Sequence, residues 1–514
     1  MAFTSLQFLG FMVLVSLGFF LLGGRLRTAW LAVACLAFYC TWGIVCLPYL
    51  AYATLLSYLY AIVFNPRGGG NQASSVLTAA SDSRAPALEQ QGPGSEVASH
   101  THGRATFVLA LTLILLPLLV TKYVPLLVAD IANLDLLVPI GISFYTFRAI
   151  SYVADVHAGK IESERNFLKY FIYMAFFPEI TSGPIERAGD FIPQLDELAS
   201  KKRSWFFSLD RIERGLITIL WGCFLKMAIA DRAAVLVNTV YAGYWKYGAV
   251  EVALAAALYS VEILCDFAGY SAIAIGCGKI LGFHLTENFM VPYAATSTRD
   301  FWRRWHISLS TWLRDYIYFP LGGSRCSQGR RYLNILIVFL VSGIWHGAGL
   351  TFVVWGGLHG LYQVIGIVLR PYKDKVIEKY HINTSVMSYR LLQIILTFAL
   401  TTLAWIFFRA PSLHVALALI KRLVLMPDPW ALFDGSLTRL GLDAAELVIL
   451  AVSIAILALF DVAQERTGAS VDECLMSQNM WFRWTALIVL FLFVFVFGQY
   501  GPAFNASSFI YSEF

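Results

Sequence analysis

Long apolar runs alternate with short charged segments along most of the sequence. An α-helix needs about 20 such residues to cross the hydrocarbon core of a bilayer. The runs centre near Val15, Cys40, Leu113, Ile142, Ala175, Leu220, Ala257, Ile337, Trp355, Phe398, Ile454 and Leu490. Because an open strand edge would leave backbone groups unpaired in lipid, we expect helices throughout. The pattern predicts an all-α integral membrane protein with about ten to twelve transmembrane helices, plus re-entrant or interfacial helices.

The composition also favours a membrane location. Of the 514 residues, 58% are apolar and 14% are charged, whereas about a quarter of the residues of a soluble domain are charged. The formal net charge is +5, with basic residues scattered among apolar runs. This scatter indicates anchors at the bilayer edge and not a nucleic-acid-binding face. We expect residues 1–514 to form one membrane domain. Its first helix, near residues 6–22, should stay attached, since no basic residue precedes it.

One segment differs from the rest of the chain. Residues 65–104 are rich in Gly, Ser, Ala, Gln and Pro and nearly free of aromatic residues. Such a composition cannot bury enough apolar surface to offset the entropy of folding. We therefore predict a disordered loop over residues 65–104.

A segment dense in tryptophan and charge, Phe301–Tyr318, lies between membrane runs. Drawn as one helix at about 100° per residue, it carries an apolar stripe. The stripe comprises Trp302, Trp305, Leu309, Trp312, Leu313 and Tyr316. The polar side comprises Arg303, Ser310 and Arg314, is bordered by His306, and is extended by Arg304, Thr311 and Asp315. Two interpretations remain open: an interfacial helix with its Trp residues at headgroup level, or a helix lining a polar cavity with His306 facing it.

A charge-free run extends between Arg331 and Arg370. As one helix it would be about 57 Å long, which is too long for a single span. The glycine-rich segment Ser342–Gly349 predicts where the helix breaks, and His346 lies in it. An ionisable residue at membrane depth is by default a functional candidate. The alternative is a histidine satisfied by a backbone carbonyl.

Other polar positions give weaker signals. His359 follows His346 by thirteen residues, which on one helix would put the two on different faces. Asp266 is an acid inside an apolar run; it could orient a histidine or bind an arginine, and a structural pairing is favoured. The eight cysteines include no CxxC pair, and no HExxH spacing occurs, so we expect no bound metal. The absence of GxSxG, Walker and GxGxxG motifs argues against a serine hydrolase, an ATPase or a dehydrogenase.

Several stretches resemble the membrane-bound O-acyltransferase family, in its bacterial alginate O-acetyltransferase-like branch. They are residues 139–148, 176–195, 265–277, 287–324, 343–350 and the ending 509–514. The most specific are the long stretch around His306 and the Trp-His-Gly of residues 345–347. The resemblance places a catalytic core at residues 139–370. One departure is Glu179, where members of the family mostly carry Gln.

The resemblance implies a multi-helix fold around a tunnel or funnel through the bilayer. A cytoplasmic acyl-CoA, such as acetyl-CoA, would be the donor substrate, with no bound cofactor. His346 matches the histidine taken as catalytic, and His306 matches a second site histidine. A histidine suits this reaction because its pKa fits a general base. The residues expected to bind substrate or support the site are Arg303, Arg304, Ser310, Arg314, Asp315, Asp266 and Trp345.

The ending Phe509–Phe514 resembles the FIYxxF ending of these acetyltransferases. By this resemblance Tyr511 could carry the acyl group as an ester, with Ser512 offering a second hydroxyl. The alternative is an aromatic anchor at the membrane edge. The family also implies a bacterial inner-membrane location, an exported polysaccharide (alginate-like) or peptidoglycan as acceptor, and a periplasmic or extracellular esterase-like partner.

Two competing functions stay open. A transporter or flippase would also contain broken apolar helices and intramembrane polar residues. A transporter of inverted repeats should have two similar halves, and none are visible in the sequence. D-alanyl transfer to teichoic acid is a second alternative. The Leu321-Gly322-Gly323 sequence and the fused FIYxxF ending favour the acetyltransferase branch.

Overall fold

The computed structural model describes residues 1–64, 101–127, 138–181 and 183–500. Over these residues every regular element is a helix, as the apolar pattern predicts. The N-terminal helices are α1 (Leu6–Leu21), α2 (Gly24–Cys40), α3 (Leu47–Phe64), α4 (Thr101–Leu127), α6 (Ile142–His157), α7 (Phe167–Ala175), α8 (Ala188–Ser200) and α9 (Arg203–Phe206). The central helices are α10 (Leu209–Cys223), the π-helical η2 (Phe224–Ala230), α11 (Asp231–Ala242), α12 (Ala249–Leu281), α13 (Thr298–Arg304), α14 (Ile307–Leu313) and the π-helical η5 (Arg314–Tyr318). The C-terminal helices are α15 (Gln328–His346), α16 (Leu350–Lys379), α17 (Met387–Arg409), α18 (Leu413–Leu425), α19 (Ala444–Thr467), α20 (Val471–Met476) and α21 (Met480–Phe497).

Seven helical segments in the described part of the chain are long and apolar enough to cross a membrane. They are Ile44–Phe64, Gly103–Val124, Ala249–Leu281, Leu350–Lys379, Met387–Arg409, Ala444–Thr467 and Met480–Phe497. Helix α1 is a shorter apolar helix. Other predicted centres fall on helices that are short, such as α7, or amphipathic, such as α10. The protein is therefore an all-α, multi-pass membrane protein.

Two predicted boundaries differ from the structure. The apolar run centred near Cys40 is two helices, α2 and α3, because the chain turns at Gly43, whose φ of 119° suits glycine. The predicted loop 65–104 lies largely outside the described residues. Its last four residues, 101–104, already belong to α4.

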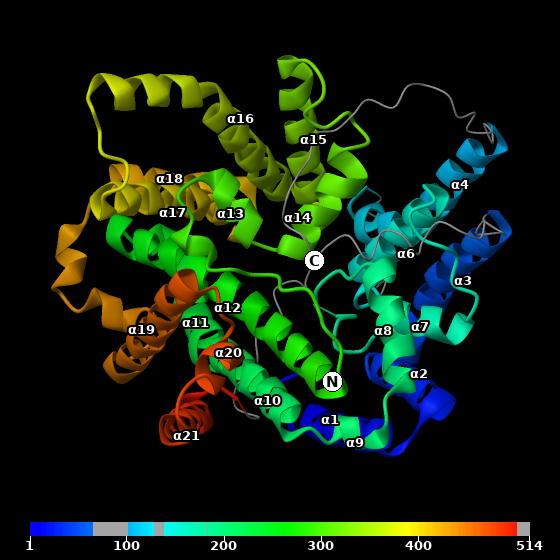
Figure 1. Cartoon of the computed structure of the whole chain (residues 1–514). Helices are drawn as coiled ribbons and strands as arrows, with labels where there is room; N and C mark the ends of the chain where they lie inside the picture. The colour runs from blue at the N-terminus through cyan, green and yellow to red at the C-terminus, as the bar shows by residue number, and fades with distance from the viewer. Residues whose placement is uncertain (65–100, 128–137, 182, 501–514) are drawn as a thin grey trace.

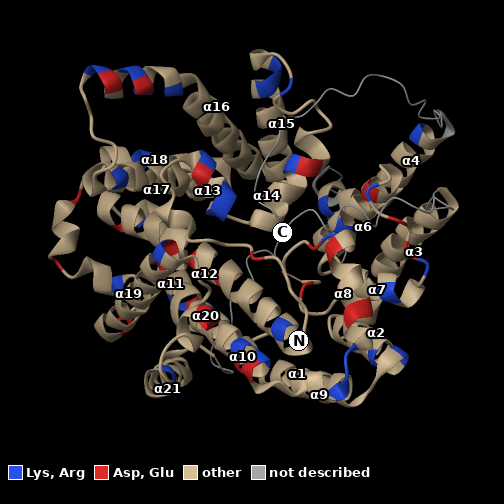
Figure 2. Ribbon diagram, viewed as in Figure 1, with Lys and Arg blue, Asp and Glu red and all other residues tan. Residues whose placement is uncertain are grey.

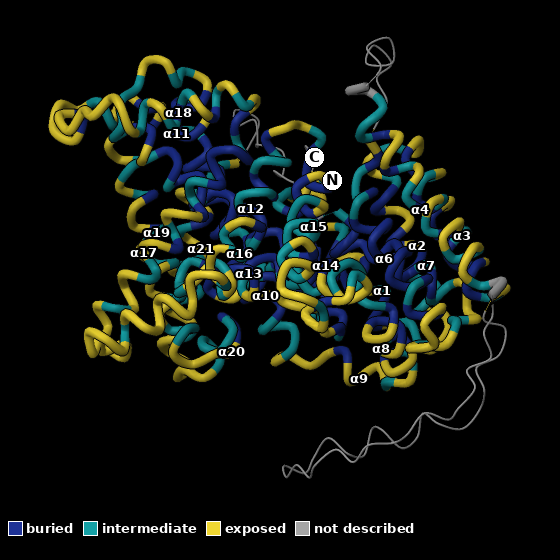
Figure 3. Tube along the Cα trace, turned by 90° about the horizontal axis from the view of Figure 1, so that it is seen from above, coloured by how far each residue is buried: buried dark blue, intermediate teal, exposed yellow. Residues whose placement is uncertain are grey.

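Helices from distant parts of the sequence surround α14, which lies near the middle of the view in Figure 1. The long helix α12 forms much of the interior, and 72% of its most apolar window is buried. Helix α21 is more apolar than α12, yet only 6% of its window is buried. Figure 3 shows the same division, with buried residues in the interior and exposed residues around the outside. An apolar helix that contacts little protein can direct its side chains into lipid, so α21 and α19 lie at the periphery of the protein.

Ion pairs connect the ends of several helices on one side of the molecule, which we call the basic end. There Lys279 of α12 lies 2.7 Å from Asp472, and Arg304 lies 2.5 Å from Glu465. Arg214 and Arg483 pair with Asp472 and Glu213 at the same end, and Arg390 pairs with Glu465. At the opposite end of α12, Arg422 of α18 donates to the carbonyl of Tyr247. Figure 2 shows largely uncharged helices, with basic and acidic residues alternating at the far end of α16.

Arg148 of α6 forms a fully buried ion pair with Glu179, in the loop between α7 and α8. Arg148 also donates to the carbonyl of Tyr173 at 2.7 Å. Its neighbour Phe147 stacks on Trp312 and Trp345, with ring centroids 4.1 and 5.0 Å apart. The ion pair therefore holds in place the part of α6 whose Phe147 packs against Trp312 and Trp345.

Replacing Arg148 with Met is expected to destabilise the protein by about 3–5 kcal/mol, because it leaves a buried carboxylate without its counter-charge. Thermal unfolding of the detergent-solubilised protein would measure this loss. The matched control is the double variant Arg148→Met/Glu179→Gln, which removes both charges and should recover much of the stability. Equal melting temperatures for the single and double variants would contradict the prediction.

Candidate active site

His306 lies at a break between two short helices. Helix α13 ends at Arg304, and α14 begins at Ile307, with His306 at a φ of 44°. The prediction of one helix over Phe301–Tyr318 is therefore wrong. The backbone N–H of Ile307 donates to the carbonyl of Asn288 at 3.0 Å and not to a carbonyl of the preceding turn. A partner distant in sequence thus replaces the helical hydrogen bond, and the stripe drawn for one helix does not persist across the break.

His346 lies at the C-terminal end of α15, and the chain breaks at Gly347 before α16 begins. This confirms the break predicted within Ser342–Gly349. The two helices cross closely, since a Cβ built on Gly343 would lie 2.3 Å from the carbonyl oxygen of Phe352. Glycine is required for that approach. Next to this close crossing His346 is buried, with 2% of its surface exposed.

The two histidines lie against the same indole. The ring centroid of Trp345 is 4.5 Å from that of His346 and 6.4 Å from that of His306. Around them lies an aromatic enclosure formed by Phe267, Trp345, Trp355 and Phe408. His306 is fully buried. Two imidazoles from different helices therefore share one buried, aromatic environment within the membrane domain.

Lys122 of α4 caps the helix that ends at His346. Its ammonium donates to the carbonyl of His346 at 3.1 Å and also to that of Trp345, while the Tyr123 hydroxyl donates to the carbonyl of Ile344. A cation is favourable at a helix C-terminus because it satisfies orphan carbonyls and opposes the dipole. Sequence reasoning missed Lys122, although a lone lysine in an apolar run was an available signal.

His359 belongs to the same surroundings, although the sequence analysis treated it as a weaker candidate. The indole N–H of Trp302 donates to its Nδ1 at 3.1 Å. Its ring lies 5.1 Å from that of Trp355, which lies 5.1 Å from that of His346. The argument from helical faces does not apply here, because the break after His346 puts the two histidines on different helices.

The predicted arginines do not converge on the histidines. Arg304 pairs with Asp300 and with Glu465, which ties α13 to α19. Arg303 is exposed. Ser310 donates from its hydroxyl to the carbonyl of Trp305 at 3.2 Å, and so helps to close the turn after the break.

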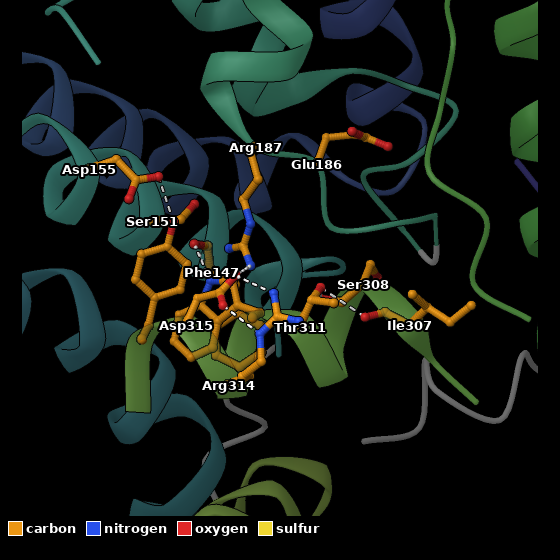
Figure 4. Close-up of polar contacts among 12 residues, drawn as sticks. Phe147, Ser151, Asp155, Glu186, Arg187, Ile307, Ser308, Thr311, Arg314 and Asp315 are labelled. Atoms are coloured by element: carbon orange, nitrogen blue, oxygen red, sulfur yellow. Dashed lines mark hydrogen bonds and ion pairs between the residues drawn. The ribbon is translucent and has the colours of Figure 1, made fainter. Parts of the chain in front are cut away.

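Arg314 and Asp315 form a separate polar group in η5. They lie 2.7 Å apart, and Arg187 approaches Asp315 at 3.7 Å from the start of α8 (Figure 4). The Arg187 guanidinium also lies over the Tyr316 ring, whose hydroxyl donates to Asp155 at 2.6 Å. This group joins η5 to α6 and α8, and Arg314 is half exposed.

Asp266 pairs with a lysine, a partner that the sequence interpretation did not consider. Its carboxylate lies 2.6 Å from the ammonium of Lys226, which lies 2.8 Å from Asp231. All three side chains are buried. Lys226 lies in η2, where the wider π-helical turn interrupts the α-helical hydrogen bonding between α10 and α11. The structural pairing favoured for Asp266 is thus present, with Lys226 as the cation.

Two cavities in the described part of the structure reach residues that contact the histidine segments. The first, of about 110 Å³, lies at the basic end and is lined by polar residues that include Ser271, Lys279, Glu287, Asn288 and Asp472. Burial raises the pKa of Glu287, in the loop after α12. The second, of about 270 Å³, is apolar and is lined by Lys122, Phe147, Trp312 and Trp345, among others. Among the described residues, no group of three His, Cys, Asp or Glu side chains could hold a metal ion.

The sequence matches a known family over half its length. Residues 145–408 match the membrane-bound O-acyltransferase family, and the chain therefore belongs to that family. This confirms the resemblance carried by the motifs around His306 and His346. Both histidines, and the helices α12 to α16 that position them, lie inside the matched region.

Three relatives illustrate the range of the family. A probable alginate O-acetylase of Pseudomonas syringae pv. tomato is 37% identical over 333 residues, which are 64% of this chain and 60% of the relative. A peptidoglycan O-acetyltransferase of Helicobacter pylori is 32% identical over 340 residues, 62% of this chain and 61% of the relative. A teichoic acid D-alanyltransferase of Bacillus subtilis is 26% identical over 288 residues, 54% of this chain and 69% of the relative. The chain thus covers about three fifths of the length of the first two.

Proposed function

We propose that this protein transfers an acetyl group from a cytoplasmic acyl-CoA, most simply acetyl-CoA, to hydroxyl groups of an exported polysaccharide (alginate-like) or of peptidoglycan. The observation that carries the proposal is the meeting of His306 and His346 against Trp345 in a buried aromatic enclosure. Relatives named for O-acetylation of alginate and of peptidoglycan, at 37% and 32% identity, support the acetyl group and the polymeric acceptor.

In the proposed reaction His346 is the general base. Its neutral imidazole takes the proton of the acceptor hydroxyl while that oxygen attacks the thioester carbonyl. The C–S bond then breaks, and the imidazolium returns the proton to the thiolate of CoA. The oxyanion that forms during the attack needs hydrogen-bond donors. Among the described residues the buried indole N–H groups of Trp345 and Trp355, which border His346, have no acceptor, and both suit that task.

The distribution of charge supports a direction for this transfer. Basic residues are enriched on the cytoplasmic side of membrane proteins, and ion-paired bases of several helices meet at the basic end of this protein. We therefore propose that the basic end faces the cytoplasm of a bacterial inner membrane. The polar cavity at Lys279 and Asp472 then lies on the donor side. The acceptor polymer and a periplasmic or extracellular esterase-like partner belong to the opposite side.

The test uses membranes that contain the full chain, supplied with radiolabelled acetyl-CoA. Transfer of label to the envelope polysaccharide or peptidoglycan is the expected result. Label that enters the polymer only from D-alanine would favour D-alanylation, the activity named for the relative at 26% identity. Movement of a labelled lipid across vesicles without acyl transfer would instead indicate a transporter. Either outcome would overturn the proposed acetyl transfer.

Tyr511 lies outside the described residues, and we propose it as an acyl carrier on its FIYxxF resemblance. In the first step the Tyr511 hydroxyl is the acceptor that attacks the thioester, and CoA leaves as the thiol. In the second step a polymer hydroxyl attacks the tyrosyl ester and the Tyr511 hydroxyl is regenerated, so one difficult transfer is divided into two easier ones. Tyr511→Phe keeps the ring and removes only the hydroxyl, so polymer-bound acetate is expected to fall to background. Ser512→Ala, which removes the adjacent hydroxyl, is the matched control and should stay near wild type. Normal acetylation by Tyr511→Phe would leave the tail as an anchor only.

A further inference from the structure

The backbone at His306 adopts a conformation that needs support. Its φ of 44° is rare for a residue with a side chain. Two hydrogen bonds flank the residue: the N–H of Met290 donates to the carbonyl of Arg304, and that of Ile307 donates to the carbonyl of Asn288, both at 3.0 Å. The segment 288–290 therefore holds the chain on either side of His306.

The side chain of Asn288 adds a further set of bonds. Its Oδ1 accepts from the backbone N–H of Ser308 at 3.2 Å and from the Ser308 hydroxyl at 2.6 Å. Its Nδ2 donates to the hydroxyl of Ser271 on α12 at 3.3 Å. Asn288 is 1% exposed, so these bonds are shielded from competing water. The amide thus links the start of α14 to the largely buried helix α12.

This arrangement replaces the usual N-cap of a helix. His306 is the N-cap residue of α14, and an N-cap side chain normally accepts from the N–H two or three residues on. Here Asn288 supplies that acceptor from another segment, and His306 makes no side-chain cap. The imidazole instead lies edge-on to Phe267, with ring centroids 4.6 Å apart, and near Trp345.

We infer that Asn288 is a positioning residue that caps α14 in place of His306 and so holds the imidazole in the aromatic enclosure. The inference rests on the proposed function, in which His306 takes part in acyl transfer. Asn288 does not itself touch the reacting groups. Its substitution should act mainly on kcat. Because Asn288 also lines the polar cavity proposed for the donor side, the KM for acetyl-CoA is measured beside kcat, and a loss confined to KM would overturn the inference.

Three substitutions separate the bonds of Asn288. Asn288→Leu removes the three side-chain bonds and keeps the backbone carbonyl that accepts from Ile307. It should lower kcat by at least about 10-fold, and by no more than the 10²–10⁴-fold expected for loss of a general acid–base group. Asn288→Asp keeps the acceptor for Ser308 and should recover much of that activity. Ser308→Ala keeps the backbone cap and should have a small effect. Gln194→Leu is the matched control, since the Gln194 amide clamps His284 in the same loop, away from His306.

The decisive experiment is a double-mutant cycle with radiolabelled acetyl-CoA and membranes that contain the full chain. In the His306→Ala background, Asn288→Leu should cause no further loss of kcat. The same fold loss in both backgrounds would overturn the inference, and so would wild-type kcat in Asn288→Leu. If Asn288→Leu does not accumulate, Asn288→Asp and Ser308→Ala are compared in the same cycle, and additive losses would again overturn the inference. Wild-type activity of His346→Ala would contradict the proposed function itself, and this outcome is distinct from a failure of the role inferred for Asn288.

Discussion

Replacement of His346 by Ala is expected to lower acetyl transfer by about 10²–10⁴-fold, the range for loss of a positioned general base. His346 is buried in the aromatic enclosure, where water has little access to act in its place. The next imidazole, His359, contacts Trp355 and accepts on Nδ1 from the Trp302 indole, so it does not take the position of His346. Polymer-bound acetate in cells, together with transfer from radiolabelled acetyl-CoA in membranes, would measure the loss.

The controls for His346 separate chemistry from folding. His346→Gln fills a similar volume and keeps a polar side chain but cannot act as a base, so it should be as inactive as His346→Ala. Both proteins should accumulate in the membrane fraction at the wild-type level. His414→Ala, which removes an exposed histidine on α18, should leave activity unchanged. Normal acetylation by either His346 variant would exclude His346 as the base.

The break at His346 could be predicted because it follows from length and composition. A charge-free run of that length cannot remain one helix within a bilayer, and glycine marks the place where two helices cross. The same reasoning predicted an all-α membrane protein from the apolar runs. These features depend on residues close together in the sequence, and for that reason the sequence alone was sufficient.

The break at His306 could not be predicted in the same way. Locally, Phe301–Tyr318 reads as a continuous two-faced helix, and no glycine or proline interrupts it. The bonds that stabilise the break involve Asn288 and Met290, which lie outside the segment Phe301–Tyr318. A tertiary contact thus overrides helical propensity. Such a contact is found only when the segments are seen together.

Buried ion pairs were the other limit of sequence reasoning. Asp266 was recognised as an acid in an apolar run, but its partner Lys226 lies forty residues earlier on a different helix. Lys122 likewise meets the end of α15 from more than 200 residues away. Partners of this kind are set by packing and leave no local pattern. The roles of the predicted site residues and of Tyr511 stay predictions that the variants above test.

The role of His306 requires a variant that respects its backbone. Alanine at a φ of 44° adds strain, so a loss in His306→Ala could combine two effects. Asparagine tolerates the left-handed region better than other residues with side chains. His306→Asn therefore removes the imidazole while preserving the break between α13 and α14.

His306→Asn is expected to lower acetyl transfer by about 10²-fold, at the lower end of the range for an acid–base group, because His346 still provides the base. The ring centroid of His306 lies 6.4 Å from that of Trp345, which itself lies 4.5 Å from that of His346, so His306 is placed to position the acceptor or relay a proton. Transfer from radiolabelled acetyl-CoA measures the loss, and His306→Ala should be at least as low. A combined His306→Asn/His346→Ala variant should lose little beyond His346→Ala alone, since residues that act as a unit are not additive. Wild-type turnover by His306→Asn would show that the ring serves packing and has no part in the reaction.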